Sequence, residues 1–117
     1  MNETLGQHQR RFLPLVAKLI EYAYAQGYEL TAGEMYRSPE QAALNAQHGT
    51  GIANSLHILR LAVDLQLFKD GTYLTDPAAY KPLGDFWKTL DPACAWGGDF
   101  TTLVDADHFS LSWGGIR

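Results

Sequence analysis

Hydrophobic residues of the N-terminal quarter recur at intervals of three and four, which is typical of an amphipathic helix. With Gly27 as the stop signal, this pattern predicts a helix over residues 5–26. Pro14 falls inside the pattern and predicts a kink or a later start, because proline lacks the backbone N–H of a helix interior. His8 lies on the polar side of this helix, where we expect it to be solvated. The apolar positions are Phe12, Leu13, Val16, Leu19, Ile20 and Ala23.

Two further helices are predicted from their start signals. Ser38 as N-cap and Pro39 at the first helical position begin a short helix over 38–47. An Asp-Pro pair at 76 and 77 begins another, in which large apolar residues share one face until a second Asp-Pro pair at 91 and 92 ends it. Both helices therefore have a defined beginning in the sequence.

The segments between the helices have the patterns of strands and turns. Residues 28–37 indicate a strand that enters a turn, although Gly33 weakens it. The segments 62–68 and 72–74 are separated by an Asp-Gly turn and predict a hairpin. The Gly-rich stretch 48–55 is predicted to be a surface loop, and short strands are expected beyond residue 94.

The order of these elements is α, β, α, β-hairpin, α, β. It predicts a small α+β fold in which helices pack on an antiparallel sheet. A chain of 117 residues is long enough for one such core, so we expect a single domain over 1–117.

Composition and charge exclude several functional classes. Hydrophobic residues make up 46% and charged residues 19%, which is typical of a globular domain. The net charge of −4 argues against a nucleic-acid partner, since such proteins carry clustered Lys and Arg. No run approaches the ~20 apolar residues of a membrane span, and no secretory signal is recognisable. We therefore expect cytoplasmic synthesis, no membrane insertion and a monomer. The single cysteine, Cys94, is expected to be a buried thiol.

The apolar stretch SLHILRLAVDLQLF, residues 55–68, contains His57 and Asp64 seven positions apart. A straight strand would place their side chains about 23 Å apart on opposite faces. A helix would separate them by about 10 Å along its axis. They can meet only if the chain bends between them and the strand begins near Ala62, with Asp64 on its more polar face.

A second candidate segment is DADHF, in which Asp105 and His108 lie three residues apart. Two histidines and one carboxylate from separate segments would leave an open position on a zinc ion, as catalytic sites do. A further carboxylate beside them could accept a proton from water. Spacing alone leaves a second interpretation open, namely a capped turn and a structural histidine.

Several motifs occur in an order that resembles a known family. SLHILRLAVDL is followed some forty residues later by WGGDFTTLVDADHF, and Tyr36-Arg37-Ser38 with Gln41 lies upstream. Together they resemble the zinc peptidases of peptidoglycan, which include D-alanyl-D-alanine carboxypeptidases and bacteriophage L-alanyl-D-glutamate endopeptidases. The resemblance spans about residues 15–112 and implies the small α+β fold of that family.

The resemblance also implies roles for individual residues. Its pattern assigns His57, Asp64 and His108 as zinc ligands and Asp105 as the catalytic acid/base. Arg37 corresponds to an arginine that binds the substrate or polarises its carbonyl group.

Two further residues are candidate substrate contacts. Ser55 stands where the family often has a serine that lines the cleft. His48 begins the Gly-rich loop and is either a substrate contact or a surface residue.

One residue departs from the pattern. The family usually has glycine three positions after the first histidine, and Arg60 stands there in this chain. Glycine adopts a tight bend easily, so Arg60 indicates either a different bend or an impaired site. Its side chain would face either the substrate or the solvent.

The resulting hypothesis is a zinc-dependent hydrolase of peptidoglycan stem peptides that uses a zinc-activated water. An endolysin-type L-alanyl-D-glutamate endopeptidase is favoured, acting on the cell wall after holin-mediated release or from a phage particle. The alternatives are a D-alanyl-D-alanine carboxypeptidase or dipeptidase, and a catalytically silent zinc-containing domain that binds the wall.

Overall fold

The computed structural model describes residues 3–49 and 55–117. Most of the predicted loop 48–55 therefore lies outside the described residues. The helices are α1 (Leu5–Ala25), α2 (Pro39–Gln47) and α3 (Pro77–Leu90), with single 3₁₀ turns η1 (Leu56–Leu59) and η2 (Gly97–Asp99). The strands are β1 (Glu29–Ala32), β2 (Ala62–Lys69), β3 (Thr72–Leu74), β4 (Cys94–Trp96) and β5 (His108–Leu111).

The first helix begins with a capping box. The Thr4 hydroxyl accepts a hydrogen bond from Gln7 N, and the Gln7 side chain accepts one from Thr4 N. The helix runs through Pro14 without an interruption, so the predicted later start is wrong and the predicted boundaries are close to those observed. No helix within the described residues is long and apolar enough to cross a membrane.

The prediction that His8 is solvated is wrong. Its side chain is buried, because the segment after β5 covers that side of α1. The His8 ring packs against Trp113 at 5.0 Å between ring centroids, and His8 Nε2 lies 2.9 Å from the Ser112 carbonyl oxygen. The polar side of α1 is thus partly an internal surface.

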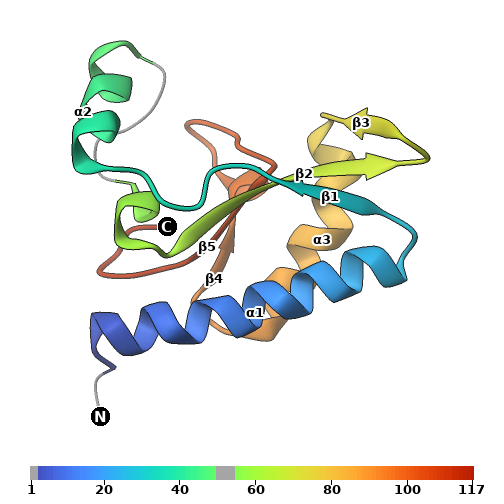
Figure 1. Cartoon of the computed structure of the whole chain (residues 1–117), viewed down its shortest axis with the longest axis horizontal. Coiled ribbons are helices and arrows are strands. Elements are labelled where there is room, and N and C mark those ends of the chain that lie inside the picture. The colour runs from blue at the N-terminus through green and yellow to red at the C-terminus, as the bar shows by residue number, and fades with distance from the viewer. Residues whose placement is uncertain (1–2, 50–54) are drawn as a thin grey trace.

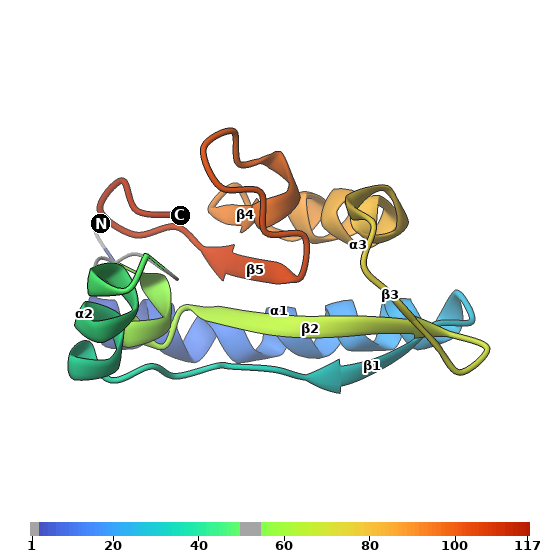
Figure 2. The same ribbon diagram turned by 90° about the horizontal axis from the view of Figure 1, so that it is seen from above.

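The sheet is antiparallel throughout, with strand order β1-β2-β5-β4 and β3 paired to β2. Helices α1 and α3 contribute Phe12 and Trp87 to the core, where Trp87 also packs edge-on against Phe109 of β5. Short α2 lies at one end of the molecule next to η1 (Figures 1 and 2). Buried Cys94 belongs to the core, and burial raises the pKa of its thiol to about 12.

Strand β2 alternates as its sequence predicts. Val63, Leu65 and Leu67 are buried in the core, whereas Asp64 and Gln66 are only partly buried. Asp64 pairs in register with His108 of β5, so these two side chains leave the sheet on the same face. The pleat therefore separates an apolar face under the helices from a polar face that carries the candidate site.

Candidate active site

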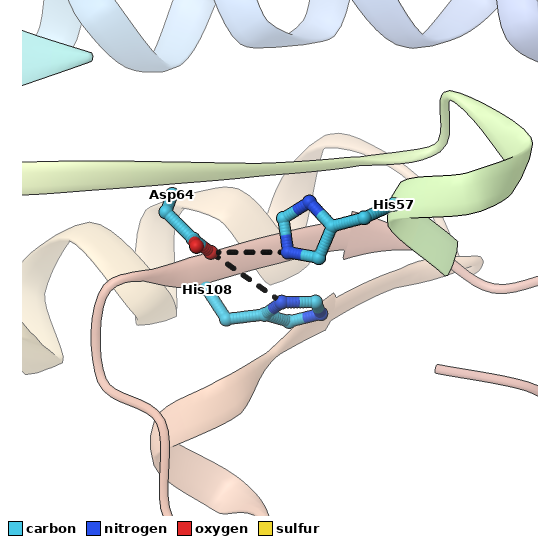
Figure 3. Close-up of side chains that lie close together, drawn as sticks. All are labelled: His57, Asp64 and His108. Atoms are coloured by element: carbon cyan, nitrogen blue, oxygen red, sulfur yellow. Dashed lines mark ion pairs between the residues drawn. The ribbon is translucent and has the colours of Figure 1, made fainter. Parts of the chain in front are cut away.

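Three side chains from different elements converge on the polar face of the sheet (Figure 3). His57 comes from η1, Asp64 from β2 and His108 from the start of β5. Asp64 Oδ1 lies 3.3 Å from His57 Nε2 and 3.7 Å from His108 Nδ1. The structure thus brings together the three residues for which the sequence predicts zinc binding.

The bend between His57 and Asp64 lies at Arg60, as the spacing requires. Arg60 adopts the left-handed conformation, with φ 58° and ψ 36°, and the strand begins two residues later. A side chain in this conformation costs roughly 1–2 kcal/mol relative to an ordinary one. The Arg60 guanidinium lies 4.1 Å above the centre of the Tyr36 ring, a cation–π contact that offsets part of this strain. The exposed Arg60 side chain does not line the pocket at the candidate site.

Residues 33–37 follow β1 and form a segment that we call the brace, because it holds the candidate ligands through backbone groups. Gly33 N donates to Asp64 O at 2.7 Å, and Asp64 N donates to Glu34 O at 2.8 Å. His57 Nδ1 lies 3.2 Å from Met35 O, and Arg37 N donates to His57 O at 3.2 Å. A Cβ at Gly33 would lie 3.1 Å from Asp64 Cβ, so glycine permits this close approach.

The three side chains fit a zinc ion. His57 Nδ1–H donates a hydrogen bond to the Met35 carbonyl oxygen, which leaves Nε2 free to bind a metal. Asp64 Oδ1 is buried and has no hydrogen-bond partner among the described residues. The three potential ligand atoms all lie within 4.8 Å of one another, while tetrahedral zinc ligands lie about 3.3 Å apart. A buried, unpartnered carboxylate oxygen between two imidazoles is what a cation would satisfy.

The charges of the cluster are set by proximity. Burial opposes ionisation of Asp64, but the imidazoles of His108 and His57 outweigh it and lower its pKa to about 2. Burial likewise opposes protonation of His57, and the Asp64 carboxylate outweighs it and raises the pKa of His57. Asp64 is therefore available as an anionic ligand at neutral pH.

Asp105 lies beside this cluster, with its Oδ2 4.0 Å from His108 Nδ1. Burial and the neighbouring Asp107 raise the pKa of Asp105 to about 7. A carboxylate with such a pKa can accept and release a proton near neutrality.

Gly97 explains why a Trp-Gly-Gly motif accompanies Asp105. Asp105 N donates to Gly97 O at 3.0 Å, and a Cβ at position 97 would lie 2.0 Å from Asp105 O. That Cβ would also lie 2.8 Å from His108 Cβ. Only glycine lets the turn that carries Asp105 and His108 pack this closely on η2.

A pocket opens over the cluster. Arg37 and Ser55 line it, and the Arg37 Nε donates to Glu34 Oε1 at 2.6 Å. The Ser55 hydroxyl also caps η1 by accepting from His57 N at 3.2 Å. His48 is exposed at the end of α2 and does not line this pocket. The full lining is Arg37, Ser55, His57, Phe100, Thr101, Thr102, Leu103, Asp105, His108, Ile116 and Arg117.

Several lining residues were not predicted. Phe100 packs its ring against His108 at 5.5 Å between centroids, and Arg117 reaches the pocket from the segment after β5. Phe100 follows directly after the Trp-Gly-Gly-Asp stretch, which is the only sequence signal for it. No periodicity or motif points to Arg117.

Comparison with known proteins identifies the family. The peptidase family described as D-alanyl-D-alanine carboxypeptidase matches residues 41–111, which is more than half of the chain. The chain belongs to this family. The matched segment includes His57, Asp64 and His108. The resemblance noted in the sequence is thereby confirmed.

One curated relative of this peptidase family is the L-alanyl-D-glutamate peptidase of Listeria phage A118. The two are 29% identical over 102 residues, which cover 84% of this chain and 36% of the relative. The chain thus spans about a third of the length of the curated relative that it matches.

Two solved structures have the same fold. Serratia marcescens L-Ala D-Glu endopeptidase ChiX has a TM-score of 0.69 and 21% identity, over 92% of this chain and 85% of its own. The vancomycin-resistance D,D-pentapeptidase VanY, solved with Zn(II), has a TM-score of 0.60 and 20% identity, over 86% of this chain and 70% of its own. The predicted α+β fold with helices on an antiparallel sheet is confirmed.

Proposed function

We propose that this chain is a zinc-dependent peptidase that hydrolyses an amide bond in peptidoglycan stem peptides. The observation that carries the proposal is the convergence of His57, Asp64 and His108. Two of these residues, His57 and His108, line a pocket together with Asp105 and Arg37. Family membership supports the same activity.

The metal has a defined chemical role in this proposal. Zinc held by His57, Asp64 and His108 would act as a Lewis acid and lower the pKa of a bound water to about 7. Asp105 accepts a proton from the attacking water and passes it to the amine nitrogen of the leaving group. In the metal-free protein, burial and Asp107 raise the pKa of Asp105, which favours its role as a proton acceptor.

Arg37 is proposed to bind the carbonyl oxygen of the scissile amide, where negative charge develops. Its ion pair with Glu34 limits the movement of the guanidinium group, so the donors are oriented before substrate binds. The Ser55 hydroxyl, which lines the same pocket, is proposed to contact the peptide. His48 is proposed to contact the substrate outside the pocket, from the end of α2.

An L-alanyl-D-glutamate bond is the proposed target, because the phage relative is named for this bond. The endolysin role, with cytoplasmic synthesis and access to the wall after holin action or from a phage particle, is proposed on the same ground. The second candidate is a D-alanyl-D-alanine carboxypeptidase, which the description of the matching family favours.

Mass spectrometry of digested muropeptides tests this proposal. The zinc-loaded protein is incubated with purified muropeptides, and the products are expected to show cleavage between L-alanine and D-glutamate. Release of terminal D-alanine instead would identify the carboxypeptidase. Intact muropeptides in the presence of folded, zinc-bound protein would exclude a peptidase and favour the silent wall-binding domain.

Variants assign the residues. His57→Ala is expected to lose zinc, whereas Asp105→Asn should retain zinc and lose at least about 100-fold in kcat. Asp85→Asn is a matched control, because Asp85 is an exposed carboxylate of α3 that pairs with Lys81. Full turnover by both site variants would show that the active site lies elsewhere.

A further inference from the structure

Arg117 brings a second guanidinium group to the pocket. Its guanidinium carbon lies 4.8 Å from the centre of the Phe100 ring, and both residues line the pocket over the candidate metal site. The aromatic face holds the planar cation without occupying its N–H donors, which point along the plane of the group.

The two arginines of the pocket differ in charge compensation. Arg37 is paired with the Glu34 carboxylate. Arg117 forms no ion pair with the side-chain carboxylate of another described residue. Arg117 is therefore the guanidinium of this pocket with charge available for an anionic group of a ligand.

A tight turn carries Arg117 to the pocket. Trp113 and Ile116 exchange two backbone hydrogen bonds of 3.0 and 2.9 Å, and Gly114 and Gly115 between them have positive φ values of 56° and 80°. Trp113 is in turn anchored on buried His8 of α1. The approach of Arg117 is thus determined by a defined turn on the core.

The distances match one feature of the proposed substrates. Phe100 contacts both Arg117 and His108, and the separations of 4.8 and 5.5 Å from its ring centre place the guanidinium no more than about 10 Å from the His108 ring. In an L-alanyl-D-glutamate bond and in a D-alanyl-D-alanine bond alike, the carbon attached to the amide nitrogen also carries a carboxylate. The carboxyl carbon lies about 4 Å from the scissile carbonyl carbon. A bidentate guanidinium adds about 4 Å more.

We propose that Arg117 is a specificity residue that binds the carboxylate on the amine side of the scissile bond. The inference rests on the proposed function and adds a binding site for this group in the pocket that Asp105 and His108 also line. Arg37 then keeps its proposed role toward the carbonyl oxygen. Replacement of that carboxylate by a carboxamide removes the partner of a charge-assisted contact and should weaken binding about 10- to 100-fold.

Ligand binding tests this site without turnover. The zinc-loaded Asp105→Asn variant is titrated calorimetrically with L-alanyl-D-glutamate and D-alanyl-D-alanine, each compared with its α-carboxamide. At least one acid is expected to bind about 10- to 100-fold more tightly than its amide. Adding Arg117→Ala should reduce the ratio of acid affinity to amide affinity to within about twofold. Arg117→Lys should restore part of this ratio, because lysine keeps the positive charge but lacks the two parallel N–H donors of a guanidinium group. Arg10→Ala, which removes an exposed arginine of α1, is the control and should leave the ratio unchanged.

Three results would overturn the proposal. They are failure of the acids to bind, equal affinity for acid and amide, and an acid preference that survives Arg117→Ala. Failure of the proposed function is distinguishable from these outcomes. If the zinc-loaded natural sequence hydrolyses neither peptide and an Arg117-dependent acid preference is still measured, the binding site stands and the peptidase assignment fails.

Discussion

The two sides of the pocket are built differently. On one side, His57 and His108 are 2% and 5% exposed, and their positions depend on strand pairing and on backbone hydrogen bonds to the brace. On the other side, the stretch from Phe100 to Val104 lies outside helices and strands, and Leu103 and Val104 are 62% and 54% exposed. The proposed metal site is thus built on the sheet and on η1, whereas the other wall consists of loops.

We propose that the two sides also differ in role: one side carries the residues for the reaction, and the loop side carries the residues for specificity. Similarity of fold does not by itself show function, so the proposed metal site rests on the placement of two imidazoles and a carboxylate in this chain. The loop wall contains Phe100 and receives Arg117, and we propose that it selects the bond that is cut.

Gly97→Ala should have the largest effect, because it forces the two sides apart. The new Cβ would lie 2.0 Å from Asp105 O, so the turn that carries Asp105 must move. We expect destabilisation of about 1–3 kcal/mol in urea unfolding and loss of most peptidase activity. Gly6→Ala is the control, because its Cβ would meet only the end of the flexible Arg10 side chain at 3.2 Å. Normal activity of Gly97→Ala would contradict the close approach described for this turn.

Glu34→Gln should act on catalysis and spare the metal. The change removes the charge that pairs with Arg37, but the backbone contacts of the brace to Asp64 and His57 remain. We expect kcat/KM to fall about tenfold, because a less constrained guanidinium is oriented less well. Zinc affinity, measured with a competing chelator, should stay the same. A large loss of zinc would mean that the carboxylate itself supports the ligands.

The pKa of Asp105 should respond both to its neighbour Asp107 and to zinc in the proposed metal site. In the metal-free protein its pKa is raised to about 7 by burial and by Asp107, so the folded state holds this proton more tightly than the unfolded chain. Stability from this group is present at acidic pH and is lost as pH rises through about 7. Asp107→Asn should lower the pKa, and zinc should lower it as well, since each change favours the carboxylate. Carboxyl-carbon NMR measures both shifts, and an unchanged titration after zinc addition would place the ion away from Asp105.

Arg60→Gly should have the smallest effect. Glycine relieves the left-handed strain at this position but removes the contact with Tyr36, and the two changes offset each other. We expect the free energy of unfolding to change by less than about 1 kcal/mol. Zinc affinity should stay the same, whereas Arg60→Val should be clearly less stable because a β-branched residue disfavours this conformation. Loss of zinc in Arg60→Gly would show that the arginine is needed for the bend.

The sequence predicts the sheet side of the pocket well. Alternation in β2 places Asp64 on the polar face, and the separation of His57 and Asp64 requires the bend found at Arg60. The interpretation of Arg60 as a sign of an impaired site is not needed, because arginine adopts the bend itself.

The loop side is predicted poorly, because its residues have neither a period nor a motif. Arg117 reaches the pocket only through a turn that is anchored on the core. The burial of His8 was missed for the same reason, since helical spacing says nothing about a distant segment that covers the helix. Sequence periodicity predicts the structure of a short segment. The contacts of His8 and Arg117 are different, because they join segments that are far apart in the chain.

The pairing of Asp64 with His108 has a consequence for how the chain folds. These residues face each other across β2 and β5 although 44 positions separate them, so closing this loop costs more entropy than forming a local contact. A slip of one residue would turn one side chain to the opposite face and dismantle the three-residue cluster. Zinc bound as proposed would therefore favour one alignment of the two strands, and the rate of zinc uptake during refolding would measure how fast this alignment forms.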